Sequence, residues 1–468
     1  MSSSACATLV LLACATLAPA QSATVARDRV PPELATLTDE ELARVLKMSP
    51  RGEQPTDPSN RVADDTRAAE LGRKLFTDTR LSPAGIACAK CHDPARAFAD
   101  GLPLARGIGE TRRNSPTLLD VARRRWFGWD GKFDSMWSQA LSPLENPVEM
   151  GGDRTTLVRV IRDDAALRAN YEAVFGAMPA VLSAREGSAD PLALPARPDA
   201  SALDSAHSKR WASLDAPSRD AIDTATANIL KSFGAYERTL VSGPTPLDRF
   251  VAALRGESGG DAAALPPSAR RGLAMFVSSA GCYQCHRGAS FTDEEFHALG
   301  LVGANGKVPD DPARLAAVEF VKANPFNLAG ALSDARDTPK ANMVKGLRRS
   351  GELFGQFRTP SLRSVALTAP YMHDGRFATL EDVVHFYDTL DGAASLDHHG
   401  ERVLAPLGLS ETQRADLVEF LRCLSPIAPE SGAKTDPPAQ PSRTSAPAGG
   451  NSLHSPKCSD VGDDGARS

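Results

Sequence analysis

Six residues of the chain combine thiol and imidazole groups in one repeated spacing. They form two C-x-x-C-H strings, Cys88-Ala89-Lys90-Cys91-His92 and Cys282-Tyr283-Gln284-Cys285-His286. In such a string the two thiols can add across the vinyl groups of a haem, and the adjacent histidine becomes a ligand of the haem iron. The sequence therefore predicts two covalently bound haem c groups, with His92 and His286 as the proximal iron ligands.

Zinc half-sites or redox-active dithiols are the alternative interpretation of the same residues. A structural zinc site usually takes its second ligand pair from another C-x-x-C or H-x-H step, and neither string has such a step nearby. Haem attachment is therefore the favoured interpretation.

Composition limits the remaining function classes. With 468 residues, of which 42% are hydrophobic, the chain is long enough for two or three domains. Its net charge of −5 argues against a nucleic-acid partner. Beyond the N-terminus, no stretch reaches the roughly 18 uncharged apolar residues of a membrane helix, so no transmembrane segment is expected. Outside the two strings, the cysteines Cys6, Cys14, Cys423 and Cys458 are too few for a disulfide scaffold, and we expect the last two to be incidental.

The N-terminal segment has the features of an export signal. Residues 1–23 contain an apolar run and end near the small-residue string Ala18-Pro19-Ala20, although no lysine or arginine precedes the run. Covalent haem attachment generally takes place outside the cytoplasmic membrane, so we expect a cleaved signal peptide and a periplasmic protein. Lipoprotein processing at Cys14, with lipid anchoring, is the alternative.

The two strings divide the chain into similar halves. Each follows an amphipathic helical stretch, at about 67–76 and 268–277, and each is followed by a long loop-rich region. Further helices are expected at about 39–48, 155–175, 218–240, 380–387 and 410–424, with Thr379 as an N-cap. The expected fold is mainly α, with little β-structure and two cytochrome c-like haem domains related by internal duplication. In chain order we predict a signal peptide (1–23), an N-terminal extension (24–66), a first haem domain (67–242) with a flexible insertion near 186–215, a second haem domain (247–426) and a disordered tail (427–468).

Over about residues 66–424 the chain resembles the bacterial di-haem cytochrome c peroxidases of the MauG superfamily. Besides the two C-x-x-C-H strings, the resemblance rests on Arg113-Asn114-Ser115-Pro116-Thr117, Gly128-Trp129-Asp130-Gly131-Lys132, Pro147-Val148-Glu149-Met150, Phe357-Arg358-Thr359-Pro360-Ser361-Leu362-Arg363 and Ala369-Pro370-Tyr371-Met372-His373-Asp374-Gly375. Singly most of these motifs are weak, but together they are specific.

The resemblance implies roles for three further residues. The family's first haem reduces hydrogen peroxide and its second haem exchanges electrons with a donor. The tryptophan between the haems matches Trp129, and the glutamine and glutamate beside the first haem match Gln139 and Glu149. A carboxylate suits O–O cleavage, because it can take a proton from one peroxide oxygen and return it to the other. Taken alone, Glu149 would be a solvated charge and Trp129 a core aromatic.

The resemblance also implies a bound calcium ion between the two haem domains. The positions that supply its ligands, an asparagine and the backbone of a Thr-x-Pro step, match Asn114, Thr368 and Pro370. Oxygen ligands of this kind suit a hard cation, although the same residues could form an ordinary polar turn.

Two positions depart from the most common family pattern. Many members carry a histidine sixteen residues after the first string's histidine, which caps the first haem until the enzyme is reduced. This chain has Ile108 there, and isoleucine cannot bind iron, so we expect a first haem that is open to peroxide. Many members also carry a methionine ligand of the second haem fourteen residues after the histidine of His-Asp-Gly, here His373.

The second departure is Tyr387, which occupies that methionine position as tyrosine does in MauG. The resemblance thus implies that His286 and Tyr387 both bind the second iron, with Met372 and His385 as nearby alternatives. An anionic oxygen ligand stabilises oxidised iron, whereas a thioether raises the reduction potential. The second haem should therefore be a poor entry point for electrons.

Three functions remain in view. The first is a periplasmic peroxidase that uses hydrogen peroxide to oxidise a small electron-donor protein. The second is a MauG-like maturase that oxidises residues of a partner protein, which Ile108 and Tyr387 favour. The third is a non-catalytic electron-transfer cytochrome, against which Glu149 and Gln139 argue.

Overall fold

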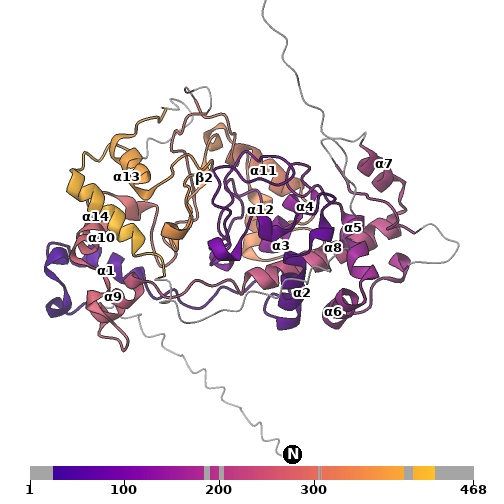
Figure 1. The fold of residues 1–468 in the computed structure, drawn as a ribbon, viewed down its shortest axis with the longest axis horizontal. Helices are drawn as coiled ribbons and strands as arrows, with labels where there is room; N and C mark the ends of the chain where they lie inside the picture. Colours follow the sequence, from indigo (N-terminus) through magenta and orange to yellow (C-terminus); the bar gives the residue numbers. More distant parts are fainter. Residues whose placement is uncertain are drawn as a thin grey trace, which may run out of the picture. The chain divides into compact units, whose positions relative to one another are not determined.

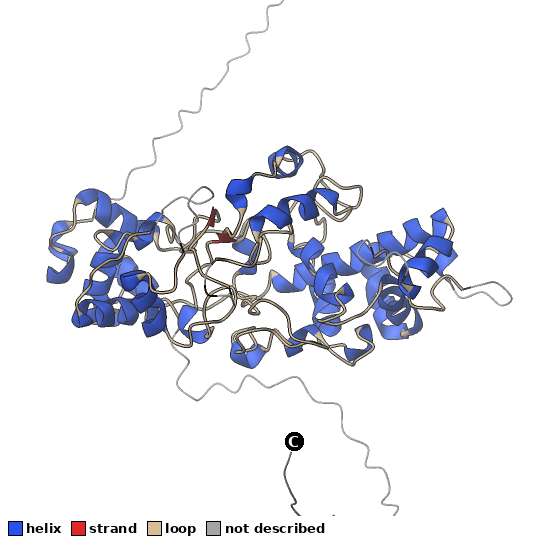
Figure 2. Cartoon of the chain, turned by 90° about the horizontal axis from the view of Figure 1, so that it is seen from above, coloured by secondary structure: helices blue, strands red, loops and turns tan. Residues whose placement is uncertain are grey.

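The structure is a computed structural model. It describes residues 25–183, 190–199, 205–303, 306, 308–394 and 404–426. The predicted signal peptide with Cys14, and the predicted tail with Cys458, lie outside this part. The described residues form one compact unit, which is mainly helical and contains little β-strand (Figures 1 and 2). The expectation of a mainly α fold is therefore confirmed.

Helices of the first half surround one apolar core. They are α2 (Thr66–Phe76), α3 (Met136–Gln139), α4 (Leu141–Glu145), α5 (Arg154–Asp163), α6 (Ala165–Phe175), α7 (Ala206–Ser213) and α8 (Ala216–Glu237). Asp65 caps α2 and Asp215 caps α8, each by accepting a hydrogen bond from a backbone N–H of the first turn. Leu75, Trp137 and Phe233 are among the side chains fully buried between these helices.

Helices of the second half build a second core. They are α9 (Pro246–Arg255), α10 (Pro267–Val277), α13 (Leu380–Thr389) and α14 (Glu411–Arg422). Capping boxes start α9 at Thr245 and α13 at the predicted Thr379. Phe276 and Phe420 pack together in this core, with ring centroids 5.1 Å apart.

One close helix contact occurs in both halves. A Cβ atom on Gly72 of α2 would lie 2.1 Å from the backbone oxygen of Ser232 on α8, and a Cβ atom on Gly272 of α10 would lie 2.1 Å from that of Asp416 on α14. Only glycine permits this approach, and each glycine precedes a C-x-x-C-H string along the chain. The two halves therefore share this close packing of a glycine against the backbone of a neighbouring helix.

Two segments do not pack in the half to which they belong by position in the chain; each packs against the other half. The N-terminal extension contributes α1 (Asp39–Lys47) and the buried residues Val45 and Met48 to the second core. Helices α11 (Arg314–Ala323) and α12 (Pro339–Gly346) follow the second string, yet Val321 and Val344 pack against Trp126 of the first half. The two halves are therefore interleaved, and a short antiparallel pair, β1 (Phe296–His297) and β2 (Phe357–Arg358), lies in the second.

The described parts of the insertion near 186–215 differ from the flexible loop suggested by its composition. Leu192 and Ala196 are buried, and Arg197 donates a 2.6 Å hydrogen bond to the backbone oxygen of Gly152. Residues 206–213 form α7. The few apolar side chains of this insertion cover the first core, which its Pro- and Ala-rich sequence does not reveal. Cys423, expected to be incidental, is buried in the second core.

Candidate haem-binding site

The two C-x-x-C-H strings have the same local conformation. Cys88–Lys90 and Cys282–Gln284 each form a turn of 3₁₀ helix. The Nδ1 atom of His92 lies 3.1 Å from the backbone oxygen of Phe98, and Nδ1 of His286 lies 2.9 Å from that of Phe291. A carbonyl can only accept, so Nδ1 carries the proton in both rings and Nε2 is left free to bind a metal.

Burial keeps these groups uncharged. It lowers the pKa of His92 to about 4 and also lowers that of His286, so both imidazoles are neutral at neutral pH, the form that binds iron. Burial likewise raises the pKa of the Cys88 and Cys282 thiols to about 12. Cys88 and Cys282 are thus protonated at neutral pH, while both imidazoles are neutral.

A cavity of about 990 Å³ adjoins the second string. Cys282, Cys285 and His286 line it, together with the apolar side chains Phe276, Leu380, Val384, Leu417 and Leu421 from α10, α13 and α14. Its size and largely apolar walls fit a haem attached at the second string. Residues of the first half, including Arg124 and Trp129, complete its lining.

A positively charged side chain in this cavity, that of Arg124, also fits a bound haem. Arg124 donates from Nη2 to the backbone oxygen of Thr117 at 2.9 Å, and it forms no ion pair with a carboxylate in the described part of the chain. Burial, with the nearby charge of Arg358, lowers the pKa of Arg124 to about 10. A haem carries carboxylate side chains, which would compensate this charge. Sequence reasoning missed Arg124, because a lone arginine in a loop resembles a surface charge.

Three residues are candidates for binding the second haem iron together with His286, and two of them reach the cavity. Tyr387 and Met372 both line it, whereas His385 is exposed on α13 and is absent from the lining. Burial raises the pKa of the Tyr387 hydroxyl, with further contributions from nearby Cys282 and Cys285, so this phenol lies close to the attachment point. Met372 adopts a left-handed backbone conformation with φ of 72°.

Trp129 connects the two halves. It lies in a turn closed by the bridge between Phe127 and Phe133, and its indole N–H donates to the backbone oxygen of Asn114 at 2.9 Å. The next residue, Ser115, donates from its hydroxyl to the backbone oxygen of Cys91 at 2.8 Å. Trp129 is therefore linked to the first string through two adjacent residues while it lines the cavity of the second.

The three candidate calcium ligands, Asn114, Thr368 and Pro370, all line the cavity beside the second string. The backbone N–H of Asn114 donates to the oxygen of His373 at 2.7 Å, and its Nδ2 donates to the oxygen of Leu102 at 2.8 Å. These bonds orient the amide, and no described residue donates to Asn114 Oδ1, which leaves this oxygen available to a cation.

Glu149 lies beside the first string. Its Oε1 accepts a 2.9 Å hydrogen bond from Asn146 Nδ2. Burial raises the pKa of the Glu149 carboxyl above its ordinary range, against the opposing effects of Lys132 and Asn146. Burial also raises the pKa of Cys91, and the negative charge of Glu149 contributes to that shift, so the two side chains are neighbours.

The side chains of Gln139 and Ile108, the other two positions expected near the first haem, form no hydrogen bond with Glu149 in the described part of the chain. Gln139 is half-buried at the end of α3, and no described residue forms a hydrogen bond with its side chain. The backbone N–H of Ile108 donates to the backbone oxygen of Glu149 at 2.9 Å, but the Ile108 side chain is 49% exposed. Ile108 thus occupies the loop next to the carboxylate and offers no ligand atom.

One cluster resembles a metal site of another kind. Cys285, Asp293 and His297 place possible ligand atoms within 4.8 Å of one another, with His297 Nε2 3.0 Å from Asp293 Oδ2. The cluster takes only one cysteine from the second string, whereas structural zinc sites usually have four ligands and use both cysteines of such a step. The zinc interpretation therefore gains little from this geometry.

Two equivalent attachment strings, neutral histidines with free Nε2 atoms and a large apolar cavity define the class of a covalent di-haem protein. The model of the di-haem cytochrome c peroxidase family matches residues 66–257. The cytochrome-c peroxidase IdrP1 of Denitromonas iodatirespirans is 32% identical over 393 residues, which cover 82% of this chain and 88% of that protein. The methylamine utilization protein MauG of Methylorubrum extorquens AM1 is 30% identical over 360 residues, which cover 76% of this chain and 77% of MauG.

The chain belongs to the di-haem cytochrome c peroxidase family, to which MauG is related, and haem c groups are the cofactors that this membership implies. Solved structures agree in fold. The diheme peroxidase BthA of Burkholderia thailandensis E264 aligns with a TM-score of 0.55 at 23% identity, over 79% of this chain and 89% of that one. A MauG-like protein associated with microbial copper homeostasis aligns with a TM-score of 0.53 at 24% identity, over 81% and 95%.

Proposed function

We propose that this protein is a periplasmic enzyme that uses hydrogen peroxide to oxidise a small electron-donor protein. Cys88 and Cys91 would attach one haem c, and Cys282 and Cys285 a second. The observation that carries the proposal is the shared geometry of the two proximal histidines, whose bonded Nδ1 and free Nε2 atoms suit two iron ligands. An electron-transfer cytochrome would need no half-buried carboxylate such as Glu149 beside the first string.

Each candidate residue has a distinct task in this proposal. A haem held by Cys88, Cys91 and His92 would supply the iron chemistry for cleaving the O–O bond of peroxide. Glu149 moves a proton from one peroxide oxygen to the other, and its raised pKa brings it closer to the working pH of a proton-transfer group. Gln139 would complete the polar side of the peroxide pocket. Trp129 would carry charge between the halves, and Tyr387 would bind the second iron.

A calcium ion held by Asn114 and by the backbone of Thr368 and Pro370 would stabilise the junction between the halves. The same asparagine accepts from the Trp129 indole through its backbone oxygen. Bound calcium would thereby hold Trp129 in place as well as the residues of its own site.

A MauG-like maturase is the second candidate, because two residues favour it. Ile108 leaves the first site without the histidine that would cap it. Tyr387 offers an oxygen ligand that stabilises oxidised iron, which suits the oxidation of a partner protein better than the uptake of electrons.

Export and partners follow from the same proposal. The attachment of haem c and the N-terminal segment support a periplasmic location. No helix in the described part of the chain is long and apolar enough to cross a membrane. The partner would be either a small periplasmic electron donor or the protein that is oxidised.

Donor oxidation coupled to peroxide distinguishes the two candidates. Reduction of peroxide to two waters takes two electrons, so a peroxidase should oxidise two molecules of a one-electron donor, such as a reduced small cytochrome c, for each peroxide consumed. A maturase should leave this donor reduced and change the mass of its protein partner. If the protein does not consume peroxide in the presence of either the donor or the partner, peroxide chemistry is excluded.

A further inference from the structure

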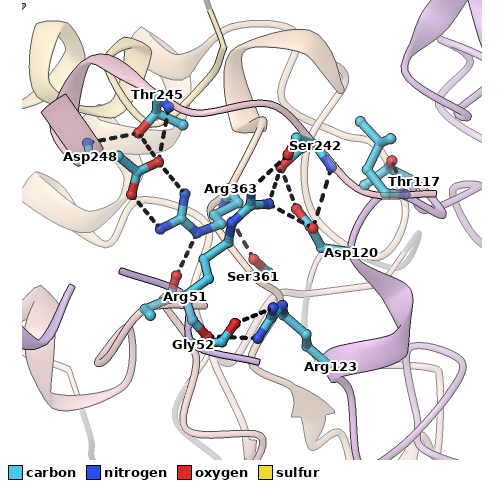
Figure 3. Close-up of polar contacts among 12 residues, drawn as sticks. Arg51, Gly52, Thr117, Asp120, Arg123, Ser242, Thr245, Asp248, Ser361 and Arg363 are labelled. Carbon is cyan, nitrogen blue, oxygen red and sulfur yellow. Dashed lines mark hydrogen bonds and ion pairs between the residues drawn. The ribbon is translucent and has the colours of Figure 1, made fainter. Parts of the chain in front are cut away.

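Arg363 occupies a buried position behind the second string. Its side chain forms a two-pronged ion pair with Asp248, from Nη1 to Oδ2 and from Nη2 to Oδ1, each at 2.9 Å (Figure 3). Nη2 also donates to the backbone oxygen of Met48 at 3.2 Å, and Nε donates to that of Ala289 at 2.5 Å. Arg363 is only 4% exposed, so this guanidinium is fixed on both edges.

The contact with Ala289 connects Arg363 to the proximal histidine. Ala289 lies between His286 and Phe291 in a short loop, and the backbone oxygen of Phe291 accepts the hydrogen bond from His286 Nδ1. The Arg363 guanidinium also lies 5.6 Å from the centroid of the Phe291 ring. Phe291 is fully buried with a φ of 52°, a conformation that non-glycine residues adopt only when their surroundings hold it. Arg363 thus braces the loop that orients the imidazole.

Asp248 keeps the guanidinium in this orientation. Its Oδ2 accepts hydrogen bonds from the backbone N–H and the hydroxyl of Thr245, the N-cap of α9 (Figure 3). Burial would raise the pKa of Asp248, but the hydrogen bonds and charge of Arg363 hold it at about 2. The carboxylate is therefore ionised throughout the working range. A lysine could not reproduce the planar fork between Asp248 and the loop oxygen.

The first half braces its own loop differently. There the hydroxyl of Thr117 donates to the backbone oxygen of Ala97 at 2.5 Å, next to Phe98, whose oxygen accepts from His92. The loop after His92 is thus held by a neutral hydroxyl. The loop after His286 is held by a guanidinium, which Asp248 anchors to the N-cap of α9. The two histidines are therefore held by loops with different hydrogen-bond donors.

We propose that Arg363 is a positioning residue that sets the orientation of His286 and thereby the strength of its bond to the second haem iron. The inference rests on the proposed binding of a haem at the second string. Hydrogen bonding to a ligating histidine tunes its strength as a ligand, so loss of the brace should change the reduction potential of the second haem and leave the first unchanged.

Electron paramagnetic resonance and potentiometric titration of the purified holoprotein test this inference without peroxide. Arg363→Gln should change the resonance positions and the midpoint potential of the second haem only, and Arg363→Lys should restore them in part. Thr117→Val, which removes the hydroxyl behind the first loop, should change the signal and midpoint potential of the first haem. The signals are assigned with variants that lack one C-x-x-C-H cysteine pair.

Arg51→Gln is the matched control. Arg51 donates to Asp120 and to Ser242 across the junction of the halves, close to Arg363 but without contact to the His286 loop (Figure 3). This variant should melt at a lower temperature and keep both haem signals. The inference is overturned if both Arg363 variants keep the second haem signal, or if Arg51→Gln shifts it equally. A wild-type protein without a second haem would instead refute the proposed function.

Discussion

Replacing Glu149 by glutamine should slow the reaction with peroxide and leave the fold intact. Glutamine keeps an oxygen at Oε1, so it can still accept the 2.9 Å hydrogen bond from Asn146, and the exchange of a charged for a neutral acceptor costs about 1 kcal/mol or less. The side chain can no longer take a proton from peroxide. Loss of one acid–base group typically slows a reaction by about 10²- to 10⁴-fold, or roughly 3–5 kcal/mol in the barrier.

The pH dependence of the same reaction supplies an independent check. Burial raises the pKa of Glu149 above its ordinary range, and the carboxyl must be ionised to accept a proton. The rate should therefore increase with pH through this raised pKa, and the increase should disappear in Glu149→Gln.

Stopped-flow absorbance with excess peroxide measures both effects, and denaturing mass spectrometry confirms that each preparation carries its haem groups. Glu172→Gln, on the exposed surface of α6, is the control and should react at the wild-type rate. An unchanged rate in Glu149→Gln, or the same pH step in both proteins, would show that Glu149 is only a buried charge.

Three further predictions follow from the site. Mass spectrometry of the denatured, exported protein should show two covalent haem groups, and replacement of both cysteines of either string by alanine should remove one; bound zinc would contradict this. Tyr387→Phe should alter the low-spin resonance of the second haem while the first keeps its high-spin signal, whereas a change in Met372→Leu alone would identify the thioether as the ligand. Chelation of calcium should lower the melting temperature of wild type but not of Asn114→Ala, and equal shifts would exclude this site.

Local features of the fold could be predicted from the sequence because nearby residues determine them. Helix α13 begins after the predicted cap Thr379, and α14 after Ser410, since a hydroxyl followed three residues later by Asp382 or Gln413 closes a capping box. The conformation of each C-x-x-C-H string is likewise determined by residues that are close together in the chain.

Contacts between distant segments could not be predicted in this way. Periodicity indicates that α1 and α11 each have an apolar face, but it does not indicate which core that face covers. The structure packs Val45 of the extension in the second core and Val321 in the first half. The interleaving of the halves is therefore a property of the whole chain.

The residues of the candidate site fall into the same two groups: those that the sequence could predict and those that only the structure identifies. Family spacing identified Trp129, Asn114 and Tyr387 as candidates, and all three line the cavity beside the second string. Arg363 lies in one of the motifs that carry the resemblance, but the motif does not reveal its ion pair with Asp248, which is far away in the chain. Arg124 lies in none of these motifs, and only the structure shows that it lines the cavity.

The central claim is that the protein reacts with peroxide through two haem sites without prior activation. The most direct test mixes the fully oxidised protein with one equivalent of hydrogen peroxide and records the absorbance of both haems. Because Ile108 leaves the first site uncapped, we expect both spectra to change at once, and we expect Trp129→Phe to alter the return to the resting state. If the oxidised protein is inert, and reacts only after one haem has been reduced, this claim is wrong: the protein is then a peroxidase that needs prior reduction, and the MauG-like maturase is excluded.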